Sequence, residues 1–547
     1  MGKLWLGCLL LPISAWAVQL PSPDRLIQQD QQRQEHIQRS IESEQHNRSR
    51  SSVISIPPRS ESTDSGICFD IEDIHFSGHS VFSDSELQLL AKPFLNRCLG
   101  MVKINALLDA VSGHYFSRGY ITSRAYLREQ NLHSGRLHIE IVEGQFSGFE
   151  SSENSFSHVF PSQINAPLNL RDLEQGLEHI NRLQSMQARM RLLPGEALGQ
   201  SRVDIDIRSN NPWWVQVKAD NSGQKTTGEE QLQGLIAWDN PLGLYDYSYL
   251  SLQTDTEFGH KDRLSRSLAW HWDIPLGYWS VALDVSRFEY QQLISGQSLM
   301  FESSGVSDSQ RLAIKRLIYR DQNSKFHVSS SLQRKQTRNY LEDVLIGVSS
   351  RVLSIAELGV DWHEYFNDGG RLFSELKYSR GIDAFGSEDS HQARFERYGL
   401  HVDFTQPFSF ADSSFVYRSQ WQCQYSDDEL YASEQVSIGS EYSVRGFKEE
   451  SLSGNSGGYW RNTLYWQPAI SEQWFSLRKA SPFIGFDAGV VRGGDDSRSR
   501  HLSGAIVGVM VSGRRWSAEI SWSEPVNRPD EFSHSDGQFY FTLSLTL

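Results

Sequence analysis

The ten residues Gln538-Phe-Tyr-Phe-Thr-Leu-Ser-Leu-Thr-Leu547 decide the fold class of this chain. Apolar side chains occupy every second position from Phe539 to Leu547, and the residues between them are Tyr, Thr and Ser. This period of two predicts a β-strand with one apolar and one polar face. An amphipathic strand that ends the chain after about a dozen similar segments is typical of the closing strand of a transmembrane β-barrel. For this segment alone, the last strand of a soluble β-sandwich is the alternative.

Residues 211–547 have the composition and the spacing that a membrane barrel requires. They hold thirteen of the fifteen Trp and seventeen of the twenty Tyr of the chain, as expected if aromatic side chains form girdles at both membrane interfaces. Segments of about ten residues alternate here, as a strand that spans the bilayer requires; examples are 247–254 and 264–272. Short links such as 240–243 alternate with long polar links such as 291–306, which indicates short periplasmic turns and long external loops. This count predicts about sixteen strands, without the fixed period of a β-propeller, the structural alternative.

The N-terminus predicts export from the cytoplasm. Lys3 precedes an apolar run, and Ala15-Trp-Ala17 follows it as a cleavage site, so we expect residues 1–17 to be a secretory signal peptide. No later run is apolar enough for a membrane helix. The net charge of −15 argues against binding to nucleic acid.

Residues 18–52 and 53–66 are expected to be a polar helix and a Ser- and Pro-rich linker. From Pro21 to Ser52 the apolar residues, apart from proline, are Leu26, Ile27, Ile37 and Ile41. A helix that is polar nearly all round cannot build a core. The residues alone therefore leave two alternatives, a disordered tail or a helix housed in a wet cavity.

Two small α+β modules are expected between the linker and the barrel. In residues 67–144 the pattern predicts the order strand, helix, helix, strand, strand, with Ser83 and Glu86 forming a capping box at the first helix. In residues 145–210 Asn169 is expected to cap a helix that two strands follow. This pattern indicates that residues 145–210 are a second copy of the same small module.

The cysteines and one glycine-rich segment bear on chemistry. Cys68 and Cys98 flank a short segment of an exported chain, where an oxidising compartment favours a disulfide; Cys423 is expected to be an inert thiol. The segment Gly454-Asn-Ser456-Gly-Gly458 is similar to the nucleophile segment of a trypsin-like protease. A nucleophilic serine needs a histidine base and an orienting acid, and no recognisable partner motif accompanies Ser456. We therefore expect no enzymatic activity, no cofactor and no metal.

Three further motifs, in this order, make a family resemblance plain. Tyr120–Leu127 followed by Glu143-Gly144 resembles the first periplasmic POTRA module of two-partner secretion transporters. The tetrad Val444-Arg445-Gly446-Phe447 resembles the signature of the sixth extracellular loop in the superfamily of POTRA-bearing outer-membrane assembly and translocation barrels. Phe483–Gly489, with Asp487 at its centre, resembles the barrel-wall motif of that superfamily. On these residues the chain resembles the hemolysin-activator family of two-partner secretion transporters.

The resemblance implies a mostly β fold: a sixteen-stranded transmembrane β-barrel (211–547) preceded by an N-terminal helix and two POTRA domains. In the family the sixth loop folds into the lumen and its arginine pairs with the wall aspartate, which here implies a pair between Arg445 and Asp487. In a wet lumen we expect that pair to contribute only about 0.2–1 kcal/mol. Cys68 and Cys98 lie where family members carry a disulfide.

The resemblance also implies a function. The polar helix would plug the resting pore of a monomeric barrel in the outer membrane of a Gram-negative cell, among outer-membrane lipid. Two periplasmic POTRA domains would receive a large unfolded exoprotein that folds outside as a β-helix: a hemolysin, an adhesin or a contact-dependent growth inhibition toxin. The alternative within the superfamily is an outer-membrane protein assembly factor, which usually carries more POTRA domains.

Overall fold

The computed structural model describes residues 23–49, 67–150, 154–257, 262–295, 299–388, 390–469, 477–493, 499–530, 532 and 536–547. The expected signal peptide (1–17) and linker (53–66) lie outside the described residues, as do residues 18–22 and 50–52 of the polar helix segment.

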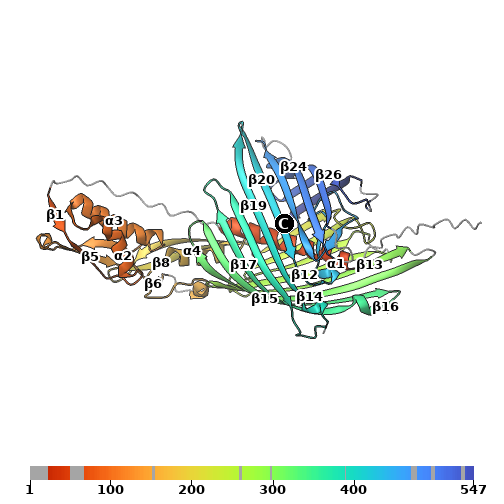
Figure 1. Ribbon diagram of the computed structural model, residues 1–547, viewed down its shortest axis with the longest axis horizontal. Helices are drawn as coiled ribbons and strands as arrows, with labels where there is room; N and C mark the ends of the chain where they lie inside the picture. Colours follow the sequence, from red (N-terminus) through yellow and green to blue (C-terminus); the bar gives the residue numbers. More distant parts are fainter. Residues whose placement is uncertain are drawn as a thin grey trace, which may run out of the picture.

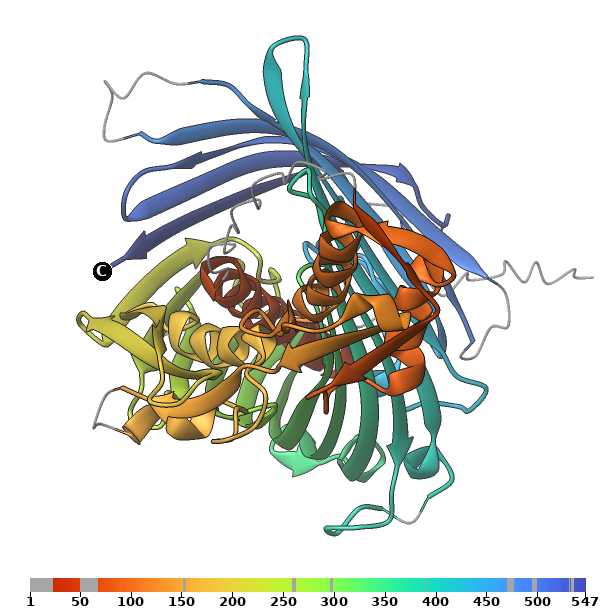
Figure 2. The same ribbon diagram turned by 90° about the vertical axis from the view of Figure 1, so that its left-hand side faces the viewer.

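The molecule has a barrel at one end and two small α+β modules at the other (Figure 1). The helix α1 (Pro23–Ser49) lies inside the barrel, as the view from the module end shows (Figure 2). Among the described residues, no helix is long and apolar enough to cross a membrane.

The barrel is a closed antiparallel sheet of sixteen strands. The sixteen strands are β9 (Trp213–Asp220), β10 (Gln231–Asp239), β11 (Tyr247–Asp255), β12 (Leu264–Leu276), β13 (Trp279–Ser295), β14 (Met300–Arg320), β15 (Ser324–Leu341), β17 (Arg351–Tyr365), β18 (Arg371–Gly381), β19 (Glu396–Phe410), β20 (Ser413–Tyr425), β23 (Ser456–Gln467), β24 (Lys479–Arg492), β25 (Arg500–Ser512), β26 (Trp516–Asn527) and β27 (Gln538–Thr546). A two-residue segment, β16 (Val344–Leu345), pairs antiparallel with the last two residues of β15 and does not cross the barrel wall. Closure occurs where β27, already paired with β26, also pairs with β9, so the C-terminal strand closes the cylinder.

The two faces of β27 confirm the alternation seen in the sequence. Phe539 and Leu543 are 48% and 45% exposed on the outside of the barrel, whereas Tyr540 and Ser544 are 4% and 8% exposed on the inside. The apolar face therefore points to lipid and the polar face to the lumen, as a membrane barrel requires.

One expectation about the barrel is wrong. Residues 291–306 are not a long loop, because β13 continues to Ser295 and β14 begins at Met300, and the two strands stay paired along this length. β14 has 21 residues, about twice the 9–11 that span a bilayer. Beyond the membrane both faces of a strand meet water, so the apolar alternation that marks a strand in the sequence is lost while the hydrogen-bond ladder continues.

The first module is a three-stranded sheet covered by two helices. The sheet has the order β2 (Asp73–Ser77), β5 (Arg136–Val142), β4 (Arg124–Leu127). The helices are α2 (Asp84–Ala91) and α3 (Met101–Ser117). A separate pair, β1 (Cys68–Ile71) and β3 (Arg97–Gly100), carries the Cys68–Cys98 disulfide, with a Cα–Cα distance of 5.3 Å. The strand β3 is missing from the expected order; its sequence Arg-Cys-Leu-Gly has no alternation of apolar and polar residues.

The expected capping box in this module is only half formed. The Ser83 hydroxyl accepts a hydrogen bond from the backbone N–H of Glu86 at 3.4 Å, as an N-cap should. The Glu86 carboxylate does not turn back to Ser83 but lies 3.0 Å from the His114 ring on α3. A tertiary partner has replaced the local one.

The second module packs on the rim of the barrel. Its sheet has the order β6 (Gln145–Phe149), β8 (Gln200–Ser209), β7 (Met186–Pro194), and α4 (Leu170–Asn181) covers it. Asn169 caps α4 by accepting a 2.8 Å hydrogen bond from the Arg171 backbone N–H. Side chains of this module share one apolar cluster with barrel residues such as Tyr247 and Tyr249. The cluster fixes the module against the barrel entrance.

Candidate functional site in the barrel lumen

The segment between β20 and β23 folds back into the barrel. It forms a small hairpin of β21 (Val436–Ile438) and β22 (Leu452–Gly454). Val444 and Phe447 are fully buried in an apolar cluster with two residues of the inner wall, Val491 of β24 and Leu502 of β25. Two of the four tetrad residues thus attach the loop to the wall by apolar packing.

The structure brings Arg445 and Asp487 together. The guanidinium donates from Nε to Oδ2 of Asp487 at 2.6 Å and from Nη2 to Oδ1 at 2.7 Å, and the Arg445 backbone N–H reaches Oδ2 at 3.1 Å. Nη2 also reaches the Thr463 hydroxyl at 3.1 Å. Arg445 is 5% and Asp487 0% exposed. The expectation that water surrounds this pair is therefore wrong, because the pair is buried and its hydrogen bonds are bidentate.

Two glycines allow the loop to approach the wall this closely. Gly446 has φ +103°, and a Cβ there would lie 3.0 Å from the backbone carbon of Glu524 on β26. At Gly504 of β25 a Cβ would lie 1.9 Å from the Arg445 carbonyl oxygen. A side chain at position 504 would displace the loop, and one at 446 would be strained by its backbone conformation.

The helix α1 contacts the same loop through its polar side chains. Gln32 donates to the Ser437 carbonyl of β21 at 3.0 Å and accepts from the Ser440 hydroxyl at 3.0 Å. At the start of the helix, Asp24 forms an ion pair with Arg351 of β17. The two residues lie 327 positions apart in the sequence, so no local pattern marks this pair.

The four apolar residues of α1 also have a place in the structure. Leu26 and Ile27 are buried against Phe288 and Tyr290 of β13. Ile37 and Ile41 pack on the cluster shared by the second module and the barrel rim. Of the two alternatives for this segment, the structure therefore contains the housed helix.

At the periplasmic end the second module is tied to the barrel through α4. The Glu178 carboxylate contacts both Arg320 of β14 and Lys325 of β15. Arg182 forms a 2.5 Å ion pair with Asp273 of β12. No local sequence signal marks these pairs, because each joins segments at least 90 residues apart.

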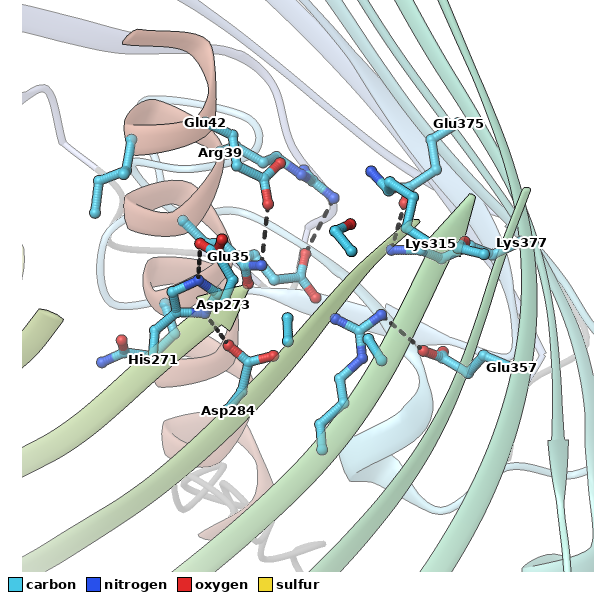
Figure 3. A pocket seen from close by; sticks show the side chains of 18 of the residues that line it. Glu35, Arg39, Glu42, His271, Asp273, Asp284, Lys315, Glu357, Glu375 and Lys377 are labelled. Carbon is cyan, nitrogen blue, oxygen red and sulfur yellow. Dashed lines mark hydrogen bonds and ion pairs between the residues drawn. The ribbon is translucent and has the colours of Figure 1, made fainter. Parts of the chain in front are cut away.

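A cavity of about 520 Å³ lies beside α1. Figure 3 shows Glu35, Arg39 and Glu42 of the helix facing the cavity, with Lys315 and Glu375 on the opposite wall. Charges of both signs line it, which suits a hydrated passage for a polypeptide rather than a site for one small apolar ligand.

In the first module Glu143, quoted above as part of a POTRA-like motif, has a structural role. Its carboxylate accepts hydrogen bonds from the Ser80 and Val81 backbone N–H groups at 2.8 and 2.9 Å and from the Tyr115 hydroxyl at 2.7 Å. Burial by itself would raise the pKa of Glu143, but these hydrogen bonds together with the Ser80 hydroxyl outweigh it and hold the pKa below its ordinary value. The pKa of Tyr115 is raised, first because its hydroxyl is removed from solvent and second because that hydroxyl is hydrogen-bonded to the Glu143 carboxylate.

The segment that is similar to a protease motif is used structurally. The Ser456 hydroxyl donates to the Ser426 carbonyl at 2.9 Å and accepts from the Ser426 backbone N–H at 3.0 Å. Both bonds are to backbone, not to a histidine base. Cys423, the remaining thiol of interest, is exposed on the outer face of β20 beside Trp421.

Comparison with known proteins gives concordant matches. A family model described as haemolysin secretion/activation protein ShlB/FhaC/HecB matches residues 199–511. A ShlB-type POTRA model matches 69–144 and a second POTRA model matches 138–194.

The similar relatives carry transporter names. The chain is 34% identical over 534 residues to the outer membrane transporter CdiB of Dickeya dadantii (strain 3937), covering 94% of this chain and 93% of that protein. It is 29% identical over 482 residues to the hemolysin transporter protein HpmB of Proteus mirabilis, covering 86% and 84%. The solved structure of CdiB from Escherichia coli superposes with a TM-score of 0.87 at 30% identity, covering 97% of this chain and 100% of that chain.

Proposed function

This chain belongs to the haemolysin secretion/activation family ShlB/FhaC/HecB, and from that premise we propose how it moves its partner protein. It is an outer-membrane transporter of two-partner secretion, with POTRA domains in the periplasm. The names of its relatives favour transport over the alternative, an outer-membrane assembly factor.

The observation that carries the proposal is the position of α1 inside the closed barrel. Its contacts are mainly hydrogen bonds and ion pairs, such as Gln32 with Ser437 and Asp24 with Arg351. Water can replace such polar contacts once the helix leaves, so their net contribution to holding the helix is smaller than their number suggests. The helix closes the resting pore and leaves as a unit when the partner enters.

The loop that carries Arg445 stays on the wall while the helix leaves. A buried bidentate ion pair and an apolar cluster around Val444 and Phe447 attach it directly to the barrel strands. We assign the Arg445–Asp487 pair a positioning role. It holds the loop against the wall, so that the loop borders the path of the partner protein once the helix has left.

The POTRA sheets supply the entry for the partner. Among the described strands, β2 and β4 are the edges of the first sheet and β6 and β7 those of the second. An unfolded chain adds to such an edge through main-chain hydrogen bonds, without a particular side-chain code. The boundaries we propose for these units are 67–144 and 145–210, with the barrel at 211–547.

The partner we propose is one large secreted protein. Of the three cargo classes that the family resemblance implies, a contact-dependent growth inhibition toxin fits best, because the relative named CdiB is more similar to this chain than the hemolysin transporter HpmB is. The barrel acts as a monomer in outer-membrane lipid, since one chain supplies all sixteen strands and the lumen contents. Ser456 serves the fold and has no catalytic role, so Ser456→Ala should export normally.

A disulfide tether tests whether α1 must leave. Gln32→Cys and Ser437→Cys place one thiol on each side of a contact between the helix and β21, and electrophoresis verifies that the disulfide has formed; Cys423→Ser removes the exposed thiol. Under oxidising conditions the tethered transporter should leave its partner in the periplasm, and a reductant should restore export. Each single cysteine variant, and the unmodified chain with the same reductant, serve as controls. Full export by the demonstrably tethered protein would refute the departing-helix proposal.

A further inference from the structure

Three potential metal ligands meet on the inner wall of the barrel, on two neighbouring strands. His327 of β15 is the direct cross-strand partner of Asp361 of β17. His363 lies two residues beyond Asp361, hence on the same face, and Trp362 between them points outward to lipid. The donor atoms of His327, Asp361 and His363 lie within 4.8 Å of one another.

Two donor atoms of this group, one on Asp361 and one on His327, lack a hydrogen-bond partner among the described residues. Asp361 is fully buried, yet its Oδ1 accepts no hydrogen bond from a described residue. The Nδ1 atom of the His327 ring makes no hydrogen bond to a described residue either. An unsatisfied buried carboxylate oxygen is costly. One carboxylate oxygen and one ring nitrogen thus remain as ligand atoms for a cation between the three side chains.

We propose that His327, Asp361 and His363 bind one divalent transition-metal ion of the zinc type. Two imidazoles and one carboxylate are a common ligand set for zinc, with a fourth position left for water. Bonds of about 2.1 Å in a tetrahedral site place ligand atoms about 3.4 Å apart. Small side-chain rotations on the fixed ladder of β15 and β17 close the present spacing to that value.

Lys315 has to be reconciled with a cation at this place. Its ammonium nitrogen lies 2.6 Å from Oδ2 of Asp361. His327 Nδ1 lies 3.9 Å from the same oxygen. In the proposed site a rotation of the carboxylate brings Oδ1 to the metal, and Lys315 remains as an outer partner that orients the carboxylate, as groups around metal ligands commonly do. The nearby Lys325 is engaged by Glu178 of the second module, which offsets its charge.

The open coordination position faces the lumen. His327 and His363 both line the cavity beside α1, so an ion and its bound water are reachable from the passage. His363 also stacks on His46 of α1, with 4.7 Å between ring centroids and 12° between planes. All three ligands nevertheless belong to the wall, so the site does not depend on the helix that the proposed function releases.

Zinc titration of the untagged, full-length protein in detergent, stripped beforehand with a chelator, tests the site directly. Calorimetry and elemental analysis after dialysis should give one zinc ion per chain. The double variant His327→Ala/His363→Ala should bind none. Loss of an outer partner of a metal ligand typically weakens metal binding roughly 10–100-fold. Asp361→Asn alters a ligand itself, so it should weaken zinc binding by at least that factor.

Two controls keep the result interpretable. His401→Ala removes another inner-wall histidine, which is bonded to Asp403 and Gln422, and should leave zinc binding unchanged. Deletion of residues 24–49 should also leave one ion bound; loss of binding on that deletion would overturn the wall-only ligand set. Absence of zinc from the unmodified protein, or undiminished binding by a correctly folded double variant, would overturn the site. Neither result bears on the plug, because export and conductance test that separately.

Discussion

Arg445 holds Asp487 through three hydrogen bonds, two from its guanidinium group and one from its own backbone N–H, at a depth where neither side chain meets solvent. The backbone bond matters as much as the charges, because it ties the carboxylate to the conformation of the loop. The carboxylate on β24 therefore sets both the place and the shape of the turn that Gly446 completes.

Breaking this pair should abolish export. Arg445→Glu and Asp487→Arg each leave a buried charge without its partner, a change that typically costs about 3–5 kcal/mol. We expect each single variant to insert into the membrane and to lose secretion, measured as partner protein in the medium. The double exchange should recover part of it.

The matched control for this series is an ion pair in water. Arg287 and Glu289 face each other on β13 with Arg287 about half exposed, and Arg287→Ala should cost little. Normal secretion by both Arg445→Glu and Asp487→Arg would remove the pair from the mechanism.

Weakening the first turn of α1 should open the pore more often. Asp24 and Arg351 are both mostly buried in their ion pair, so Asp24→Asn removes a charge-assisted bond that contributes about 1.5–3 kcal/mol. The open probability in planar bilayers should rise roughly tenfold or more, since each 1.4 kcal/mol is about a factor of ten. Glu44→Gln, which alters an exposed pair within the helix, is the control; equal open probabilities for the two variants would contradict the anchoring role.

The Glu143 site predicts how the first POTRA domain responds to pH. The folded-state pKa of Glu143 is lowered from its ordinary value of 4.5. Its stabilising effect is therefore fully present above about pH 4.5 and is lost as the pH falls through the lowered folded-state value. Glu143→Gln should cost about 1 kcal/mol at pH 7, because solvent reaches part of the site.

Hydrogen exchange of the full-length protein can check this. The exchange rate of an unprotected amide itself depends on pH. Comparing Glu143→Gln with the unmodified chain at the same pH removes this dependence. The difference in protection near residues 80–81 should be constant from pH 7 to about 5 and should shrink at lower pH. If the difference in protection grew as the pH fell, the folded-state pKa of Glu143 would be raised rather than lowered, contrary to this account.

Patterns with a local signature could be predicted from the sequence. The alternation from Phe539 to Leu547 is contained in one short segment, so it predicted the closing strand and its two faces correctly. The tetrad around Arg445 carried information about a distant partner, Asp487, only through its family resemblance. The caps at Ser83 and Asn169 are likewise local.

Features set by distant residues could not be predicted. The burial of the Arg445–Asp487 pair depends on how deeply the loop sits, which no residue of the loop reveals alone. Glu178 contacts Arg320 and Lys325 only because the second module docks on the barrel. The extension of β13 and β14 beyond the membrane carries no apolar pattern, since both of its faces are wet.

Single-channel conductance of the protein lacking residues 24–49, compared with the intact protein in planar bilayers, tests most directly whether one helix closes an otherwise open cylinder. We predict a larger and more stable conductance for the shortened protein, with intact protein mostly closed. Equal conductance in the two proteins, or failure of the shortened protein to form a channel in lipid, would contradict the account.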